Sequence, residues 1–553
     1  MEEQRRHKNG MILEVDENPK KAREWIILAI QHVLARFVAC ITVPRIVFAG
    51  YVGPNGESLV SSLIAPTILS AGIGSLIYLI LTKRKSPRFL SSSFAYISPM
   101  VSAVSLGKEP LFNESGVFLG YSANLFSLPL GRAFVGLVYV IVALIIKSVG
   151  VGWLNKLLPT IVVGPVIMVI GLGLSSSAVS SLRSGPHLSF DALGKTSWSS
   201  GYNLIALASG LVARLVTALC SHYGKKTVAL IPFVLGRLAG YGFALIFTLI
   251  SYAINEANPL HEYFRIIDFS PIVDLFTTTN KEGERVFSLS FQSFLDYPKF
   301  LFLPESWNYS SSSYVYTTNG TLPSLLEEGK TIIDTSTLVK AGNPFSASQI
   351  GSIALLFLPV SFVTICEHIG DHKNRSGLLQ RDLLKDPGLT RTLRGDGLAT
   401  AASGLFCGAA NTTYGENVAV VGVTKVASVK VIALACLFSI LLAFLSPLRA
   451  LTETIPSCVT GGVSLLLYGF IAASGVKRRI NEHVDRGKTK NIFVTSVILV
   501  AGIGGLILSF GPWENPERVK VTSTATARIL GIIRNAILKD KKPEAEDIET
   551  LPE

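Results

Sequence analysis

The chain has 553 residues, of which 49% are hydrophobic and only 16% are charged, and its formal net charge is +12 at pH 7. Soluble chains carry about 25% charged residues, so this shortage of charge argues against a row of soluble domains. The net positive charge suggests a nucleic-acid partner, but the positions of the basic residues, described below, exclude one.

Residues 1–23 form a charged N-terminal tail without a signal-peptide pattern. Apolar runs begin at 24–50 and 59–81, and further runs continue to residue 253. A helix needs about 20 residues to cross the hydrocarbon core of a bilayer, and several of these runs reach that length. The sequence therefore predicts an all-α polytopic membrane protein whose first half is 24–253.

Polar residues interrupt the first run. Gln31 and His32 lie well inside it, and Arg36 follows His32 by four positions, which places both on one helical face. Ionisable groups inside a span are costly and indicate function. His32 is therefore a candidate for proton coupling, although a buried histidine also serves as ordinary packing. Arg36 lies too deep to reach the membrane surface.

Two short segments break the helical pattern, FLSSSFAYISP at 89–99 and NTTYGENVAV at 411–420. Paired interruptions in two apolar halves are typical of transporters with an inverted repeat and a binding site at the midplane. Irregular backbone at that depth must line a covered or water-filled cavity, so we expect the two segments to face each other. Side-chain alternation places only one of Phe94 and Tyr96 in the site.

A hydrophilic stretch at 254–349 separates the two halves and is predicted to be an extracytoplasmic insertion. The second half is 350–538, and residues 539–553 form a C-terminal tail. Basic residues gather in alternate loops, at 82–88, 371–395 and 476–490, and in both tails. This is the positive-inside pattern, which predicts cytoplasmic termini and needs no nucleic acid.

The second half carries three candidate carboxylates. Glu367 and Asp371 are four positions apart, on one helical face. Glu367 could simply end its span in solvent, but the basic stretch begins only at Lys373. Glu416 follows Tyr414 and Gly415 and precedes Asn417, where exposed N–H groups could form a nest for a polar ligand. It could also only cap the next helix.

The sequence contains no phosphate-binding loop and no Cys/His cluster with zinc spacing, so neither an enzyme nor a metal or organic cofactor is expected. The carboxylates instead suggest H⁺ as the coupling ion.

Several separated motifs, in order, resemble one family. QHVLARF, SSSFAYISP, CEHIGDH, the stretch 391–429 and 456–475 are similar to the nucleobase–cation symporters, also called the nucleobase-ascorbate transporter family, and NTTYGEN resembles its uracil permease branch. The resemblance implies fourteen membrane segments in two inverted sets of seven, with strand-like pieces in segments 3 and 10. Segments 1–4 and 8–11 would form a core domain that moves against a gate of segments 5–7 and 12–14.

The resemblance also implies residue roles. Glu367 and Glu416 would hold the edge of a pyrimidine, and Phe94, Tyr414 and Gly415 would contribute stacking or N–H donors. Gln31, Asn417 and Arg36 would support the site. Asp371 departs from the histidine of similar uracil permeases and matches some purine-transporting relatives. Glu367, Asp371, Glu416 and His32 are the candidates for proton coupling.

The expected function is proton-coupled uracil import through the cell membrane by alternating access, with the bilayer and a second copy in a homodimer as partners. Three alternatives stay open. They are a xanthine, uric acid or other purine symporter on the same fold, a non-transporting membrane receptor, and an anion transporter of the sulfate-permease type.

Overall fold

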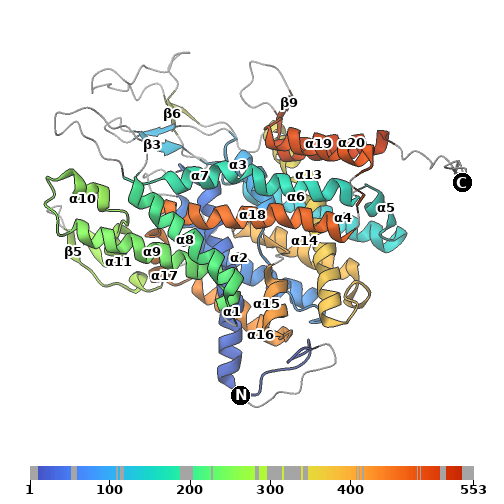
Figure 1. The fold of residues 1–553 in the computed structure, drawn as a ribbon, viewed down its shortest axis with the longest axis horizontal. Helices are drawn as coiled ribbons and strands as arrows, with labels where there is room; N and C mark the ends of the chain where they lie inside the picture. Colours follow the sequence, from blue (N-terminus) through green and yellow to red (C-terminus); the bar gives the residue numbers. More distant parts are fainter. Residues whose placement is uncertain are drawn as a thin grey trace, which may run out of the picture.

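The computed structural model describes residues 10–51, 59–106, 110–112, 118–121, 123–157, 159–186, 203–225, 228–279, 285–295, 314–316, 338–340, 347–406, 408–409, 411–413, 416–482, 484–485, 487–510 and 519–538. Most of this part of the chain is helical, as Figure 1 shows.

The elements of the first half, in chain order, are α1 (Ala22–Val47), α2 (Leu59–Leu81), β1 (Ser91–Ser92), η1 (Phe94–Tyr96), α3 (Ile97–Val104), β2 (Pro110–Phe112), β3 (Phe118–Tyr121), α4 (Ser127–Val149), α5 (Gly152–Leu157), α6 (Thr160–Gly173), α7 (Ser175–Arg183), α8 (Leu204–Tyr223), η3 (Val228–Leu230) and α9 (Pro232–Ser251).

The stretch expected as an insertion contains α10 (Pro259–Phe264), α11 (Ser270–Leu275), β4 (Thr277–Thr279), β5 (Arg285–Phe287), η4 (Phe291–Ser293), β6 (Tyr314–Tyr316) and β7 (Leu338–Lys340). The second half contains α13 (Ala347–Leu379), η6 (Leu384–Gly388), α14 (Leu389–Leu405), β8 (Asn411–Thr412), α15 (Glu416–Thr424), α16 (Val429–Leu442), α17 (Ser446–Glu453), α18 (Ser457–Asn481), α19 (Thr489–Ile503), β9 (Leu508–Phe510), β10 (Val519–Val521) and α20 (Ser523–Ile537).

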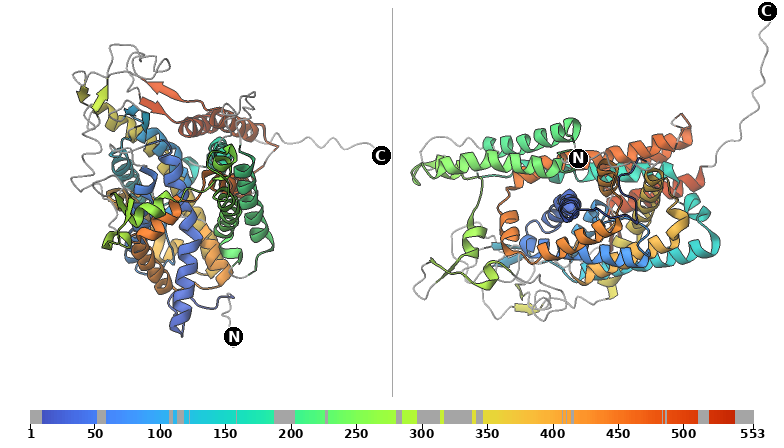
Figure 2. Two further views of the ribbon diagram at one scale, coloured as in Figure 1. Left: turned by 90° about the vertical axis from the view of Figure 1, so that its left-hand side faces the viewer. Right: turned by 90° about the horizontal axis from the view of Figure 1, so that it is seen from below.

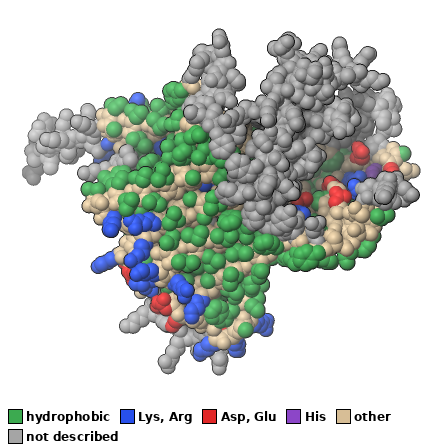
Figure 3. Space-filling model, turned by 180° about the vertical axis from the view of Figure 1, so that it is seen from behind, with side chains coloured by type: hydrophobic (Ala, Val, Ile, Leu, Met, Phe, Trp, Pro, Cys, Tyr) green, Lys and Arg blue, Asp and Glu red, His purple; other side chains and the backbone are tan. Residues whose placement is uncertain are grey.

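Eight helices in the described part of the chain are long and apolar enough to cross a membrane. Three shorter apolar helices, at Phe94–Val104, Val429–Leu442 and Thr489–Ile503, add to them. These elements confirm the polytopic helical class, and the number of fourteen segments stays a prediction. Figure 3 shows a broad hydrophobic face, with Lys and Arg side chains and a few acidic ones at its lower left and a second group of acidic and basic side chains at the right.

The two interrupted segments meet. β1 pairs with β8 in antiparallel register, with Ser91 opposite Thr412 and Ser92 opposite Asn411. Each strand leads into a short helical stretch, η1 and α3 after β1 and α15 after β8. The predicted strand-like breaks therefore exist and lie side by side.

α1 crosses the bundle steeply. It stands upright in Figure 1, where α18 lies across the view, and it is seen nearly end-on from below in Figure 2. This arrangement brings the middle of α1 against the chain that enters β1.

One boundary differs from the sequence-based expectation. The basic stretch 371–395 was expected as a loop, but α13 continues to Leu379 and α14 begins at Leu389. His368, His372, Arg375 and Leu379 are all buried on α13. Their spacing of four, three and four residues is that of one helical face, so burial of this stripe keeps the polar stretch helical.

Candidate functional site

A cavity of about 730 Å³ lies beside the β1–β8 pair. Its wall combines η1, α6, α13 and α18 with Thr413, the residue after β8. The lining contains Phe94, Glu367 and Asp371 from the residues singled out in the sequence. The same wall carries the basic side chains Lys373, Lys477 and Arg478.

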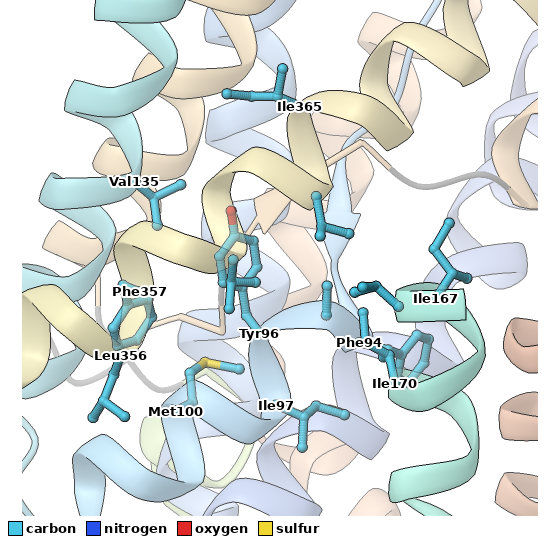
Figure 4. Close-up of a cluster of buried hydrophobic side chains, with 14 of the residues drawn as sticks. Phe94, Tyr96, Ile97, Met100, Val135, Ile167, Ile170, Leu356, Phe357 and Ile365 are labelled. Carbon is cyan, nitrogen blue, oxygen red and sulfur yellow. The ribbon is translucent and has the colours of Figure 1, made fainter. Parts of the chain in front are cut away.

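The structure separates Phe94 from Tyr96. Phe94 lines the cavity and meets the ring of Tyr468 edge-on, with 6.2 Å between ring centroids. Tyr96 turns into the core, where it stacks on Phe357 at 6.2 Å and its hydroxyl lies 2.7 Å from the Thr364 hydroxyl. In Figure 4 the two aromatic side chains accordingly lie apart, Phe94 beside Ile170 of α6 and Tyr96 towards Phe357 of α13. Only Phe94 is placed to cover a flat ligand.

Glu367 and Asp371 share the face of α13 that borders the cavity. The charges that act on Glu367 and its surroundings include the buried guanidinium of Arg528 on α20. Asp371 lies in the field of Arg88, Arg375 and Arg478. The two carboxylates therefore face the cavity within a positively charged setting.

The remaining expected ligands lie at the start of α15. Tyr414 and Gly415 fall outside the described residues, as do the side chains of Glu416 and Asn417, which are the first two residues of α15. Thr413 lines the cavity. Because three residues span at most about 10 Å, the N-terminus of α15 begins close to it.

A buried polar network lies behind the cavity, centred on Asp396 of α14. Both Asp396 and His368 are fully buried, with His368 Nδ1 2.7 Å from Asp396 Oδ2. Thr412 and Thr413 donate to the same carboxylate oxygen at 3.0 and 2.7 Å. Arg88 donates to the Thr413 hydroxyl. Asp396 thus fixes the backbone that carries β8, and a buried carboxylate is stable only with such partners.

The sequence analysis did not single out Asp396. It lies in RGDG, at the end of the stretch predicted as a basic loop. The sequence feature that could have marked it is the glycine on either side of it, Gly395 and Gly397. A Cβ on Gly395 would lie 3.1 Å from the ring of Tyr78, and one on Gly397 would lie 2.4 Å from Tyr139 Cβ. Two glycines that allow close helix packing around an acidic residue mark a buried carboxylate.

Gln31, His32 and Arg36 are not among the described residues that line the cavity. His32 and Arg36 are buried in α1. Arg36 Nη1 donates to the Leu90 carbonyl at 2.7 Å, and its guanidinium lies 3.0 Å from the centroid of the Phe89 ring. These contacts support the chain that enters β1.

A second cavity, of about 980 Å³, lies between α1, η4, α16 and α17. Every side chain that lines it is hydrophobic. Sites for small polar ligands need a few placed polar groups, so the cavity beside the strands is the candidate site.

Comparisons with known proteins identify the family and the fold. Residues 23–279 and 313–509 match the model of a permease family, Xan_ur_permease. The uracil permease of Bacillus caldolyticus is 33% identical over 540 residues, covering 98% of each chain. Uracil permeases of Bacillus subtilis (strain 168) and Escherichia coli (strain K12) are 32% and 31% identical, covering 95% and 93% of this chain and 94% and 91% of theirs.

Two solved structures share the fold. The transmembrane domain of a cyanobacterium bicarbonate transporter, BicA, has a TM-score of 0.50 at 10% identity, covering 94% of this chain and 99% of that one. The murine Solute Carrier 26 family member A9 anion transporter, in an inward-facing state, has a TM-score of 0.50 at 11% identity, covering 94% of this chain and 69% of that one.

Proposed function

The chain belongs to the permease family that it matches over residues 23–279 and 313–509, and from this premise we propose that it imports uracil together with a proton. It is a transporter and not an enzyme. The substrate is proposed from relatives that are themselves named uracil permeases.

One observation carries the proposal, the combination of an aromatic face and carboxylates in one cavity beside paired strands. Uracil is flat and presents ring N–H donors next to carbonyl acceptors. Phe94 covers the ring, Glu367 accepts from an N–H group, and Glu416 at the start of α15 holds the other edge. A base that leaves these buried polar groups unmatched loses affinity, which supplies the selectivity.

Transport follows by alternating access, in which the segments that hold the base move against the rest. Glu416 or the Glu367–Asp371 pair takes up the proton, and the loss of charge lets the loaded site shift inward. Under this proposal Glu416→Gln abolishes uptake, and discharging the pH gradient with an uncoupler abolishes wild-type uptake. Uptake that an uncoupler leaves unchanged would refute the proton step and leave the substrate standing.

Uptake of labelled uracil into cells that hold the protein in their membrane tests the substrate. Unlabelled uracil should compete, while xanthine, uric acid and sulfate should not. Competition by xanthine or uric acid instead would favour a purine symporter, which Asp371 also fits. Competition by sulfate would favour an anion transporter, and no saturable uptake of any base would favour a receptor.

A further inference from the structure

The guanidinium of Arg478 on α18 lies flat against α13. Its Nη1 donates to the Cys366 carbonyl at 3.2 Å. A Cβ built on Gly370 would lie 3.3 Å from Nη1, 3.7 Å from Cζ and 3.8 Å from Nη2. All three atoms lie within contact range of this position, so the guanidinium covers the backbone of this helical turn. A methyl group at Gly370 would be tight only against Nη1.

This turn carries the two carboxylates of the site. Glu367, Gly370 and Asp371 all line the cavity, and Arg478 lines it with them. Positions 367, 370 and 371 share one helical face, so the cation on Gly370 lies next to both acidic residues. Arg478 is also one of the cations that act on Asp371.

The neighbouring basic residues of α18 are placed differently. Lys477 lines the cavity but is exposed to solvent. Arg479 packs its Cγ 2.6 Å from the Cβ position of Gly164 on α6. The three successive cations therefore have three environments, and Arg478 is the one seated on the carboxylate-bearing turn.

We propose that Arg478 is a positioning residue that sets the proton affinity of the Glu367–Asp371 pair and ties α18 to α13 at the substrate site. This inference rests on the proposed function. A guanidinium beside a carboxylate favours its ionised form, so the pair takes up its proton at a lower pH than it would without Arg478. In the expected division α13 belongs to the core and α18 to the gate. The contact would then break whenever the core moves, which couples protonation to movement.

Other charged and titratable groups also surround the pair and are unchanged in the two Arg478 variants below. They are Cys366, His368, Lys373 and Arg375 on α13, Tyr96 on η1, Arg88 before β1, Asp396 on α14, Lys477 and Glu482 on α18, and Arg528 on α20.

The test is uracil binding to purified protein as a function of pH. Arg478→Gln keeps a donor for the Cys366 carbonyl and removes the charge. If binding needs the protonated pair, its alkaline midpoint should rise by about one pH unit, because loss of the cation raises proton affinity. Arg478→Lys should restore the midpoint, and Lys488→Gln, a control at an exposed lysine that does not line the cavity, should leave it within about 0.3 unit, since exposed charges interact weakly.

Thermal unfolding of each variant in the same detergent checks that the fold is kept. A midpoint for Arg478→Gln equal to that of the wild type, in folded protein that binds uracil, would overturn the role of Arg478 alone. A wild-type protein that binds no uracil at any pH would overturn the proposed function and this role with it.

Discussion

The two interrupted segments pair as strands but bring different chemistry to the site. The segment of the first half supplies an aromatic wall, with Phe94 at the cavity and Tyr96 in the core. The segment of the second half is held from behind by Asp396 through Thr412 and Thr413, and Glu416 opens its helix. The two segments therefore share a strand-to-helix backbone, while one presents an aromatic ring to the cavity and the other is held by a buried carboxylate.

The largest effect should come from breaking the support of the second segment. Asp396→Ala leaves His368, Thr412 and Thr413 without their shared acceptor. Removing one member of a buried hydrogen-bonded pair costs about 3–5 kcal/mol, so we expect a large loss of thermal stability together with loss of uptake. Thr412→Val removes only the hydrogen bonds of the Thr412 hydroxyl with Asp396 and with the Tyr139 hydroxyl and should cost about 2 kcal/mol. Equal stability of Asp396→Ala and wild type would show that the network does not hold β8.

Two variants of the aromatic segment should separate an effect on substrate binding from an effect on stability. Phe94→Ala should raise the KM for uracil roughly 5-fold or more, because stacking of a base on an aromatic ring contributes about 1–3 kcal/mol. Tyr96→Phe, the matched variant, loses only the hydrogen bond to Thr364 and should lower stability by about 1 kcal/mol with KM unchanged. If Tyr96→Phe raised KM and Phe94→Ala did not, the assignment of the two rings would be reversed.

An exposed ion pair joins the loop before β1 to η6, which precedes α14, and its removal should have the smallest effect. Lys85 Nζ lies 2.9 Å from both carboxylate oxygens of Asp386. Its hydrogen bonds and charge, with that of Arg381, lower the pKa of Asp386. The pair therefore adds stability above the unfolded pKa of about 4 and loses it as the pH falls through the lower folded value.

Asp386→Asn should accordingly lower the melting temperature slightly at pH 7. It should have no effect below about pH 2, where Asp386 is protonated and as neutral as the asparagine that replaces it. Added salt should shrink the difference at pH 7, because exposed pairs are screened. A difference that persisted in acid would indicate a role for Asp386 other than this ion pair.

The sequence predicted the membrane class, the two breaks and the cavity-facing position of Glu367 and Asp371, because each has a local signal. Apolar length marks a span, and four-residue spacing places two residues on one face. The hydrophilic composition of 371–395 also predicted a loop between two helices. This prediction was wrong, because α13 and α14 extend into the stretch. His368, His372 and Arg375 are buried by residues from other parts of the chain, and a local sequence pattern does not predict such contacts.

Asp396 and Arg478 escaped the sequence analysis for the same reason. Each is one charged residue in a polar or basic stretch. The residues that it contacts lie on a helix distant along the chain, so no local pattern indicates its role. Arg36 shows the converse case. The sequence marked it as unusual, and the structure shows that it donates to the Leu90 carbonyl and lies over the Phe89 ring.

The central claim is that Glu367 binds uracil in the cavity beside the paired strands, and direct binding to purified protein tests it. We expect saturable binding by the wild type and an affinity roughly 10- to 150-fold lower for folded Glu367→Gln, since a hydrogen bond to a charged group is worth about 1.5–3 kcal/mol. Binding of uracil by Glu367→Gln with wild-type affinity would contradict the account.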